Sequence, residues 1–358
     1  MISFIVSILV LIISYFTYGK LVEKIFGVQE HRKTPAIRLR DDVDYMPLST
    51  WRVFMIQFLN IAGLGPIFGA IAGAMYGPAA FLWIVLGSIF AGAVHDYFSG
   101  MLSVRHDGLS ISEIVGIYLG PKVKHIMRFF TVILLIFVGT VFLVGPAKII
   151  DGMMGNLWGV WIWVSIILVY YILSTLLPIN KLISKLYPIF GIAMLLMALG
   201  LLSALFFGDY QIPELIPENL SNMTTNPEET PLFPMLFVTI ACGAISGFHA
   251  TQSPLMARCI KNEKLGRKIF FGTMITEGIV ALIWAAAAMT FFGNVGELNS
   301  AMLENNNNAA WAANEISLNM LGGIGGILAL LGIVAAPITS GDTAFRSARL
   351  ILSDILKL

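Results

Sequence analysis

The sequence predicts an all-α, polytopic membrane protein of about nine transmembrane helices, arranged as an inverted five-helix repeat whose second half is incomplete. Hydrophobic residues make up 57% of the chain and charged residues 12%, a balance that no soluble domain of this size needs. A bilayer crossing takes about 20 apolar residues. Stretches of this kind lie at 2–19, 53–76, 79–103, 129–147, 157–177, 186–207, 233–257, 269–293 and 320–341.

Charged residues alternate from one predicted loop to the next. All but one of the 22 Lys and Arg residues fall in every second loop, and Lys148 is the exception. The loops at 208–232 and 294–319, on the opposite side, hold eight carboxylates and no Lys or Arg. Cytoplasmic loops carry the excess of Lys and Arg, so we expect a multi-pass protein of the cell (inner) membrane with its N-terminus outside and its C-terminus cytoplasmic.

The first apolar stretch has features of a secretory signal but not all of them. It lacks a positive n-region and a small-residue cleavage site before Lys20, and cations follow it. We therefore expect a retained first span.

Two spans contain helix-breaking residues. In the second span, Gln57, Asn60 and Gly63 are spaced by three residues and lead into Gly65 and Pro66. Pro66 removes a backbone donor and clashes with the preceding turn, so the helix is predicted to kink or unwind near mid-membrane. The seventh span has a similar run, 246–254. Freed backbone groups in hydrocarbon cost several kcal/mol each, so such breaks persist only inside protein or beside a wet cavity.

The two breaks lie five helices apart and in spans of opposite direction. Secondary transporters place broken helices of this kind at the midplane, where half-helix ends meet substrate and ion. The alternative is that Gly and Pro only permit close helix packing. The transporter interpretation predicts one transmembrane domain over 1–358, with a first helix and loop at 1–52, a first repeat at 53–207 and a partial second repeat at 233–358. Two further helices of that repeat are missing, so we expect a natural short form or a C-terminal truncation.

Ionisable side chains inside the spans are candidates for ion coupling. Asp96 shares a small polar helix face with Gly92, Ser99, Gly100 and Ser103. A charge at this depth costs about 2.5–3.5 kcal/mol, so Asp96 is either a proton carrier or held by a structural hydrogen bond. The same alternatives apply to Glu277 in the eighth span. His95 points away from the polar face and is predicted to be a packing residue.

The end of the ninth span also offers oxygen ligands. Its sequence 337–343 places hydroxyls beside a carboxylate and near a second expected helix break. These groups are either Na⁺ ligands or an end-of-helix cap at the membrane boundary. The predicted ion-coupling residues are Asp96, Glu277, Thr339, Ser340 and Asp342. Arg258, Arg346 and Arg349 are predicted to anchor the topology.

His249 lies in the predicted seventh-span break, beside a row of polar residues. Its imidazole is expected either to bind a substrate carboxylate or relay a proton, or else to cap unsatisfied carbonyls. The predicted substrate-binding residues are Asn60, Gly63, Gly65, Pro66, Ser246, Gly247, His249, Thr251, Gln252 and Ser253.

Catalytic signatures are missing from the sequence. It has no His-Glu-x-x-His pair, no Gly-x-Ser-x-Gly elbow and no Walker-type loop, and Cys242 and Cys259 flank one span without plausible pairing. We therefore expect no enzyme activity, no metal site and no cofactor beyond H⁺ or Na⁺ as coupling ion. The expected partners are a small-molecule substrate and the lipid bilayer, without nucleic acid. A membrane nutrient sensor or accessory subunit without transport is the alternative function.

Several stretches resemble the carbon starvation protein A (CstA) family of transporters. They are Asp42–Pro47, Ile61–Gly69, Ala91–Phe98 with Ser103–Arg105, Ser246–Arg258 and Pro337–Arg349. Ala70 departs from the family, which often repeats Gly-Pro there. The resemblance implies a LeuT-like, broken-helix symporter that takes up peptides or pyruvate during carbon starvation.

Overall fold

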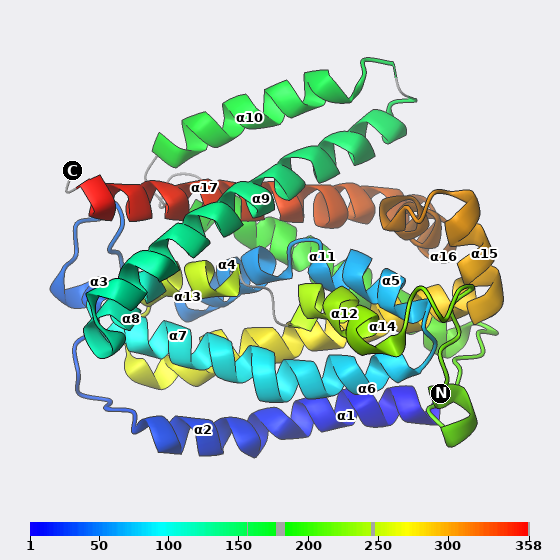
Figure 1. Cartoon of the computed structure of the whole chain (residues 1–358), viewed down its shortest axis with the longest axis horizontal. Coiled ribbons are helices and arrows are strands. Elements are labelled where there is room, and N and C mark those ends of the chain that lie inside the picture. Colours follow the sequence, from blue (N-terminus) through cyan, green and yellow to red (C-terminus); the bar gives the residue numbers. More distant parts are fainter. Residues whose placement is uncertain (156, 177–182, 245–247, 357–358) are drawn as a thin grey trace.

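The computed structural model describes residues 1–155, 157–176, 183–244 and 248–356, and every regular element in these ranges is a helix (Figure 1). Five helices are long and apolar enough to cross a membrane, or up to seven if each of two bent helix pairs counts as one span. Two shorter apolar helices cover Val160–Thr175 and Leu232–Ala241. The predicted all-helical polytopic membrane protein is therefore confirmed, with five to seven crossings by length and composition in the described ranges.

The first span is longer than predicted. Helices α1 (Ile2–Phe16) and α2 (Tyr18–Phe26) together form one apolar helix over Ile2–Phe26. Phe4 and Leu11 are fully buried, whereas Ile2 and Ile13 on the other face are exposed. This division matches a helix with one side against the bundle and one side toward lipid.

The second span breaks where Gly63 and Pro66 predict it. Helix α4 (Thr50–Ala62) is followed by a short helical turn η1 (Gly65–Gly69) and α5 (Ala70–Ala74), and the two halves are bent by 51°. Gly63 has φ +45° and ψ −122°, a conformation that side chains rarely adopt. A Cβ there would also lie 3.0 Å from the ring of Phe142. The break therefore needs glycine at this position.

The third span continues without a break. It comprises α6 (Ala79–Leu86), the wider turn η2 (Gly87–Gly92) and α7 (Ala93–Arg105). The small polar face predicted around Asp96 is buried in the bundle. Helices α8 (Ile111–Leu119), α9 (Pro121–Met153), α10 (Val160–Leu176) and α11 (Ile183–Phe207) follow. Helix α9 crosses α17 obliquely, and α10 lies at one edge of the bundle (Figure 1).

The seventh span is divided between α12 (Phe237–Ala244) and α13 (His249–Ala257). The prediction that the break extends through His249 to Pro254 is wrong, because α13 begins at His249 and contains Pro254. Pro254 lies inside this helix and removes a single backbone donor, which weakens the helix without ending it. Ser246 and Gly247 lie outside the described residues.

The last elements surround the centre of the bundle. Helix α14 (Gly272–Phe291) is almost wholly buried and is preceded by η5 (Glu263–Leu265) and η6 (Arg267–Phe271). The other elements of this part are η3 (Pro217–Leu220), η4 (Leu232–Leu236), α15 (Val295–Glu304), α16 (Ala309–Ala329), η7 (Leu330–Val334) and α17 (Ala335–Leu356).

The ninth span bends earlier than predicted. The bend of 62° lies between Ala309–Leu328 and Leu331–Arg349. The expected helix end at 337–343 is wrong, since these residues lie inside α17. Pro337 falls in the first turn of α17, where a missing N–H leaves no intrahelical hydrogen bond unmade. The hydroxyls of Thr339 and Ser340 consequently do not cap a helix end.

Alternate loops meet at opposite ends of the bundle. At one end, called the basic end here, the loops at 27–49, 106–110 and 258–262 are joined by hydrogen bonds from Met46 N to Arg258 O (3.1 Å) and from Tyr45 Oη to Asp107 O (2.8 Å). At the other end, Asn299 Nδ2 donates to the carbonyls of Met75 (2.9 Å) and Met223 (3.1 Å). Loops that alternate along the chain therefore lie at alternate ends of the bundle, as the predicted topology requires.

Candidate functional site

Three ionisable side chains from separate helices meet in the centre of the bundle. Asp96 comes from α7, His249 from the first turn of α13 and Glu277 from α14, and all three are fully buried. His249 Nδ1 lies 3.3 Å from Asp96 Oδ2, and His249 Nε2 lies 3.8 Å from Glu277 Oε2. We call these residues the His249 cluster. Sequence reasoning selected each of them but did not predict that they are neighbours.

The geometry around His249 is suited to a proton shared between this side chain and Asp96. His249 Nε2 is 3.2 Å from the carbonyl oxygen of Ile61, at the end of α4. A carbonyl only accepts, so this contact places a proton on Nε2. The other ring nitrogen faces the Asp96 carboxyl, which also accepts when ionised. Neither His249 Nδ1 nor Asp96 Oδ2 has a hydrogen-bond partner among the described residues, although the two atoms lie 3.3 Å apart. A favourable contact between them needs a proton on one of the two groups, so the pair is suited to hold an additional proton.

His95 contacts the His249 cluster through Asp96, although the sequence analysis predicted only a packing role for His95. Its Nδ1 is 3.0 Å from Asp96 Oδ1, and its side chain is 38% exposed. The signal in the sequence is its position directly before Asp96, on the flank of the polar helix face. Asp96 is thus contacted by one histidine on each side.

Several buried polar groups near the cluster have no hydrogen-bond partner among the described residues. They include both carboxylate oxygens of Glu277. They also include the side-chain amide nitrogen and oxygen of Asn60 and of Gln252. Gln57 donates to Ser253 Oγ at 3.1 Å, but its own oxygen is unpartnered. Buried polar groups are ordinarily paired, so this concentration beside the break at Gly63 is suited to an ion, water or polar ligand.

Helix α13 presents the predicted substrate residues on two faces. His249, Gln252 and Ser253 point toward the cluster and α4, at the spacing of one helix face. Thr251 lies on another face, where its hydroxyl donates to Phe248 O at 2.8 Å. Gly63, Gly65 and Pro66 form the neighbouring break in the second span.

The predicted ion-coupling residues are divided between two places. Ser340 Oγ reaches the carbonyl oxygen of Asn60 at 2.9 Å, which brings α17 against the second-span break. Thr339 Oγ1 donates to Ala336 O within its own helix. Asp342 lies apart from the His249 cluster and accepts a hydrogen bond from the hydroxyl of Tyr187 on α11.

The three arginines that were predicted as topology anchors all donate hydrogen bonds to backbone carbonyls. Arg346 is buried and donates to Ser174 O at 2.8 Å. Arg349 donates to Thr175 O at 2.8 Å, and Arg258 donates to Gly108 O at 2.9 Å. These contacts join helices and loops, and Arg346 does so inside the bundle.

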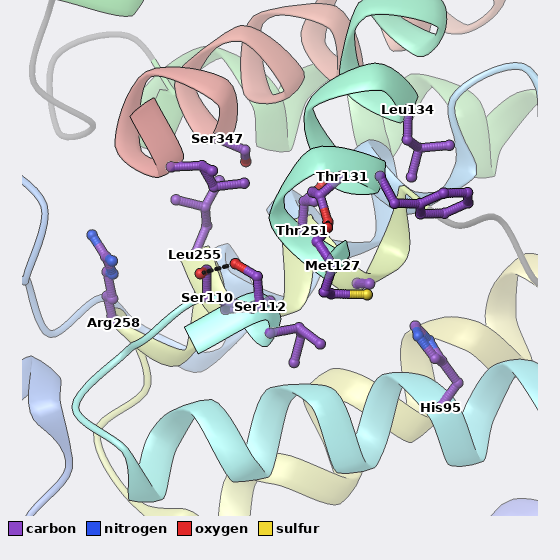
Figure 2. Close-up of a pocket in the computed structure, with 15 residues that line it drawn as sticks. His95, Ser110, Ser112, Met127, Thr131, Leu134, Thr251, Leu255, Arg258 and Ser347 are labelled. Atoms are coloured by element: carbon purple, nitrogen blue, oxygen red, sulfur yellow. Dashed lines mark hydrogen bonds between the residues drawn. The ribbon is translucent and has the colours of Figure 1, made fainter. Parts of the chain in front are cut away.

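A cavity of about 200 Å³ lies on the side of α13 away from the cluster, toward the basic end. Figure 2 shows His95 projecting into it from α7, with Arg258 at the opposite side. Its lining residues are His95, Ser110, Ile111, Ser112, Met127, Phe130, Thr131, Leu134, Ala250, Thr251, Pro254, Leu255, Arg258, Ser347 and Ile351. His95 therefore contacts both the cavity and the buried Asp96.

The fold and the site define a polytopic helical membrane protein with ionisable groups enclosed in its bundle, an arrangement that marks ion and substrate pathways. The profile of the family described as carbon starvation protein CstA matches residues 1–160 and 158–325. The chain belongs to this family, and the resemblance predicted from its motifs is confirmed.

Similar proteins include one of close length and several longer transporters. A Haemophilus influenzae protein described as an uncharacterized membrane protein is 43% identical, over 84% of this chain and 94% of that protein. The Bacillus subtilis peptide transporter CstA is 26% identical, over 79% of this chain and 57% of its own length. The Escherichia coli pyruvate/proton symporter BtsT is also 26% identical, over 79% and 48%. The chain thus spans about half the length of these named transporters, none of which is named as an enzyme.

Proposed function

We propose that this protein is a secondary active transporter that takes up a small organic carboxylate together with a proton. The His249 cluster carries this proposal, because it buries two carboxylates and an imidazole at distances suited to sharing a proton. Neither oxygen of Glu277 has a hydrogen-bond partner among the described residues. A buried ionisable group without a fixed partner is expensive to keep, and in membrane proteins it marks a pathway for protons, ions or substrate.

The substrate class follows from chemistry that the relatives' names have in common. One relative is named a peptide transporter and another a pyruvate/proton symporter. Peptides and pyruvate share a carboxylate. Unpartnered amides at Asn60 and Gln252, next to the break at Gly63, are donors of the kind that would bind it. We assign the substrate site to this region, with His249 between substrate and Asp96.

The proposed architecture is a nine-span, LeuT-like inverted repeat with broken helices in spans two and seven. The two broken spans touch, since a Cβ on Gly73 would lie 2.9 Å from the side chain of Ile240 on α12. Contact between broken helices of opposite direction supports a transport site between them.

A sodium ion is the second candidate for coupling. The contact between Ser340 Oγ and Asn60 O brings hydroxyl and carbonyl oxygens together at the helix break, and such hard oxygen ligands suit Na⁺. The shared proton of the His249 cluster favours H⁺, and the transport experiment separates the two ions.

Transport in proteoliposomes tests the proposed function. We expect uptake of radiolabelled pyruvate or of a di- or tripeptide to follow an imposed pH gradient and to persist as counterflow without one. Uptake that follows a Na⁺ gradient alone would contradict proton coupling and favour the Ser340 site. Binding of these compounds without uptake or counterflow would contradict transport and favour a nutrient sensor.

The proposed orientation places the N-terminus outside and the basic end in the cytoplasm, because the loops at that end carry the cations. Cysteines introduced at Asn219 and Asn306 should react with a membrane-impermeant maleimide added to intact cells. A cysteine introduced at Lys264 should react only after the membrane is opened. The opposite labelling pattern would reverse the orientation.

A further inference from the structure

We propose that His95 is the residue through which the buried His249 cluster exchanges its proton with water in the cavity at the basic end. The proposal rests on the proton coupling proposed above and names its route. His95 is the member of this chain of groups that reaches the cavity, whereas Asp96, His249 and Glu277 are fully buried.

The distances form a continuous series from the cavity to the core. His95 Nδ1 is 3.0 Å from Asp96 Oδ1, and Asp96 Oδ2 is 3.3 Å from His249 Nδ1. Glu277 then lies 3.8 Å from the far ring nitrogen of His249. The two oxygens of Asp96 therefore face different histidines, and its carboxyl group connects them.

Each transfer in this series conserves protons. A proton on Asp96 passes from Oδ1 to His95 Nδ1, and the resulting imidazolium releases its Nε2 proton to a water molecule in the cavity. Asp96 is left ionised and accepts the next proton from His249 through Oδ2. Rotation of the His95 ring then turns its protonated nitrogen toward the cavity and its unprotonated nitrogen toward Asp96, which allows the next transfer. Imidazole suits this step because its two nitrogens allow it to accept on one side and donate on the other.

The cavity beside His95 is lined by few charged side chains, and the nearby Glu113 on α8 is paired with Lys124 and Arg128 on α9. Among the residues that line the cavity, Arg258 is the only other one with a titratable side chain, and it comes from the far end of α13. The remaining polar lining consists of hydroxyls from Ser110, Ser112, Thr131, Thr251 and Ser347. On the buried side, the facing titratable groups are Asp96 itself and, behind it, His249 and Glu277. Hydroxyls can order water without binding the proton permanently.

His95→Gln tests the route, because glutamine keeps a hydrogen-bond donor toward Asp96 but does not titrate. We expect uptake driven by a pH gradient to fall by roughly 10²-fold, the scale of a lost proton-transfer group. Counterflow, which needs no net proton movement, should be unchanged. His106→Gln is the matched control at the end of the same helix. His106 contacts Leu102 O and Tyr118, outside the series, so both activities should match the parent.

The outcomes separate this route from the proposed function. Parent-like driven uptake by His95→Gln, or equal loss of driven uptake and counterflow, would overturn the route. A parent protein without pH-driven uptake would instead refute the proton coupling itself.

Labelling tests access to position 95 independently of transport. In a background without Cys242 and Cys259, His95→Cys should react with a small, water-soluble thiol reagent from the side of Lys264 only. Lack of reaction from both sides would show that water does not reach this position and would overturn the proposal. Membrane insertion of both variants is checked by their recovery in the membrane fraction, and their folding by size-exclusion chromatography in detergent.

Discussion

The His249 cluster and the network around Asp342 are both buried carboxylate sites in one helix bundle, but their polar groups are paired differently. In the Asp342 network, Oδ2 of the carboxylate accepts from Tyr187, whereas Oδ1 has no hydrogen-bond partner among the described residues. Arg346, one helical turn farther along α17, donates to the Ser174 carbonyl. In the His249 cluster, both oxygens of Glu277 lack partners among the described residues. The two sites therefore differ in pairing rather than in burial.

We infer from this difference that the Asp342 network is structural and that the His249 cluster serves the proposed transport. The Asp342 network joins α10, α11 and α17 through neutral and charged hydrogen bonds, and its loss would leave buried groups unsatisfied. The His249 cluster lies between α7, α13 and α14 beside a helix break, where unpartnered groups remain available to a proton or ligand.

The largest expected effect comes from exchanging the two carboxylates for amides. Asp96→Asn should reduce pH-driven uptake by roughly 10²-fold or more, because the residue between the two histidines no longer carries a proton. Asp342→Asn should instead lower thermal stability in detergent while the folded fraction keeps driven uptake. Equal loss of driven uptake per folded molecule in both variants would remove the distinction between the two sites.

The next comparison removes a hydrogen-bond donor from the Asp342 network in one variant and an unpartnered amide near the His249 cluster in the other. Tyr187→Phe takes away the hydroxyl that donates to Asp342 and should cost about 1–3 kcal/mol of stability, measured by thermal or denaturant unfolding. Gln252→Leu removes a buried amide that has no partner among the described residues, so stability should be unchanged while uptake falls. A strongly destabilised Gln252→Leu variant would mean that the amide is structural.

The smallest effect is expected at an exposed ion pair, which serves as the reference for both buried sites. Lys264 Nζ lies 2.7 Å from Glu30 Oε1 at the basic end, and this hydrogen bond holds the pKa of the Glu30 carboxyl below its ordinary value. Any stability from the pair is present above the ordinary carboxyl pKa and declines as the pH falls through the lowered value. Both side chains are more than half exposed, so Glu30→Gln should leave the unfolding temperature and uptake unchanged near pH 7. A clear destabilisation at that pH would show that the basic end depends on this pair.

The sequence alone determined the features that depend on local chemistry. Apolar length fixes where helices can cross a membrane, and the charge alternation correctly grouped the loops that meet at each end. The break in the second span was also predictable, because Gly63 and Pro66 act on their own backbone. The motifs around Asp96, His249 and 337–349 were sufficient to indicate the family that the profile match confirms.

Only the tertiary structure decided which ionisable groups are neighbours. Asp96, His249 and Glu277 are far apart in the chain, and their meeting depends on how α7, α13 and α14 pack. The same packing separates Asp342 from them and turns His95 toward both Asp96 and the cavity. Helix continuity at Pro254 and Pro337 was likewise mispredicted: Pro337 lies in the first turn of α17, and α13 continues through Pro254 although this proline removes one backbone donor. Local sequence specifies backbone preferences, but the pairing of buried charges is a property of the assembled bundle.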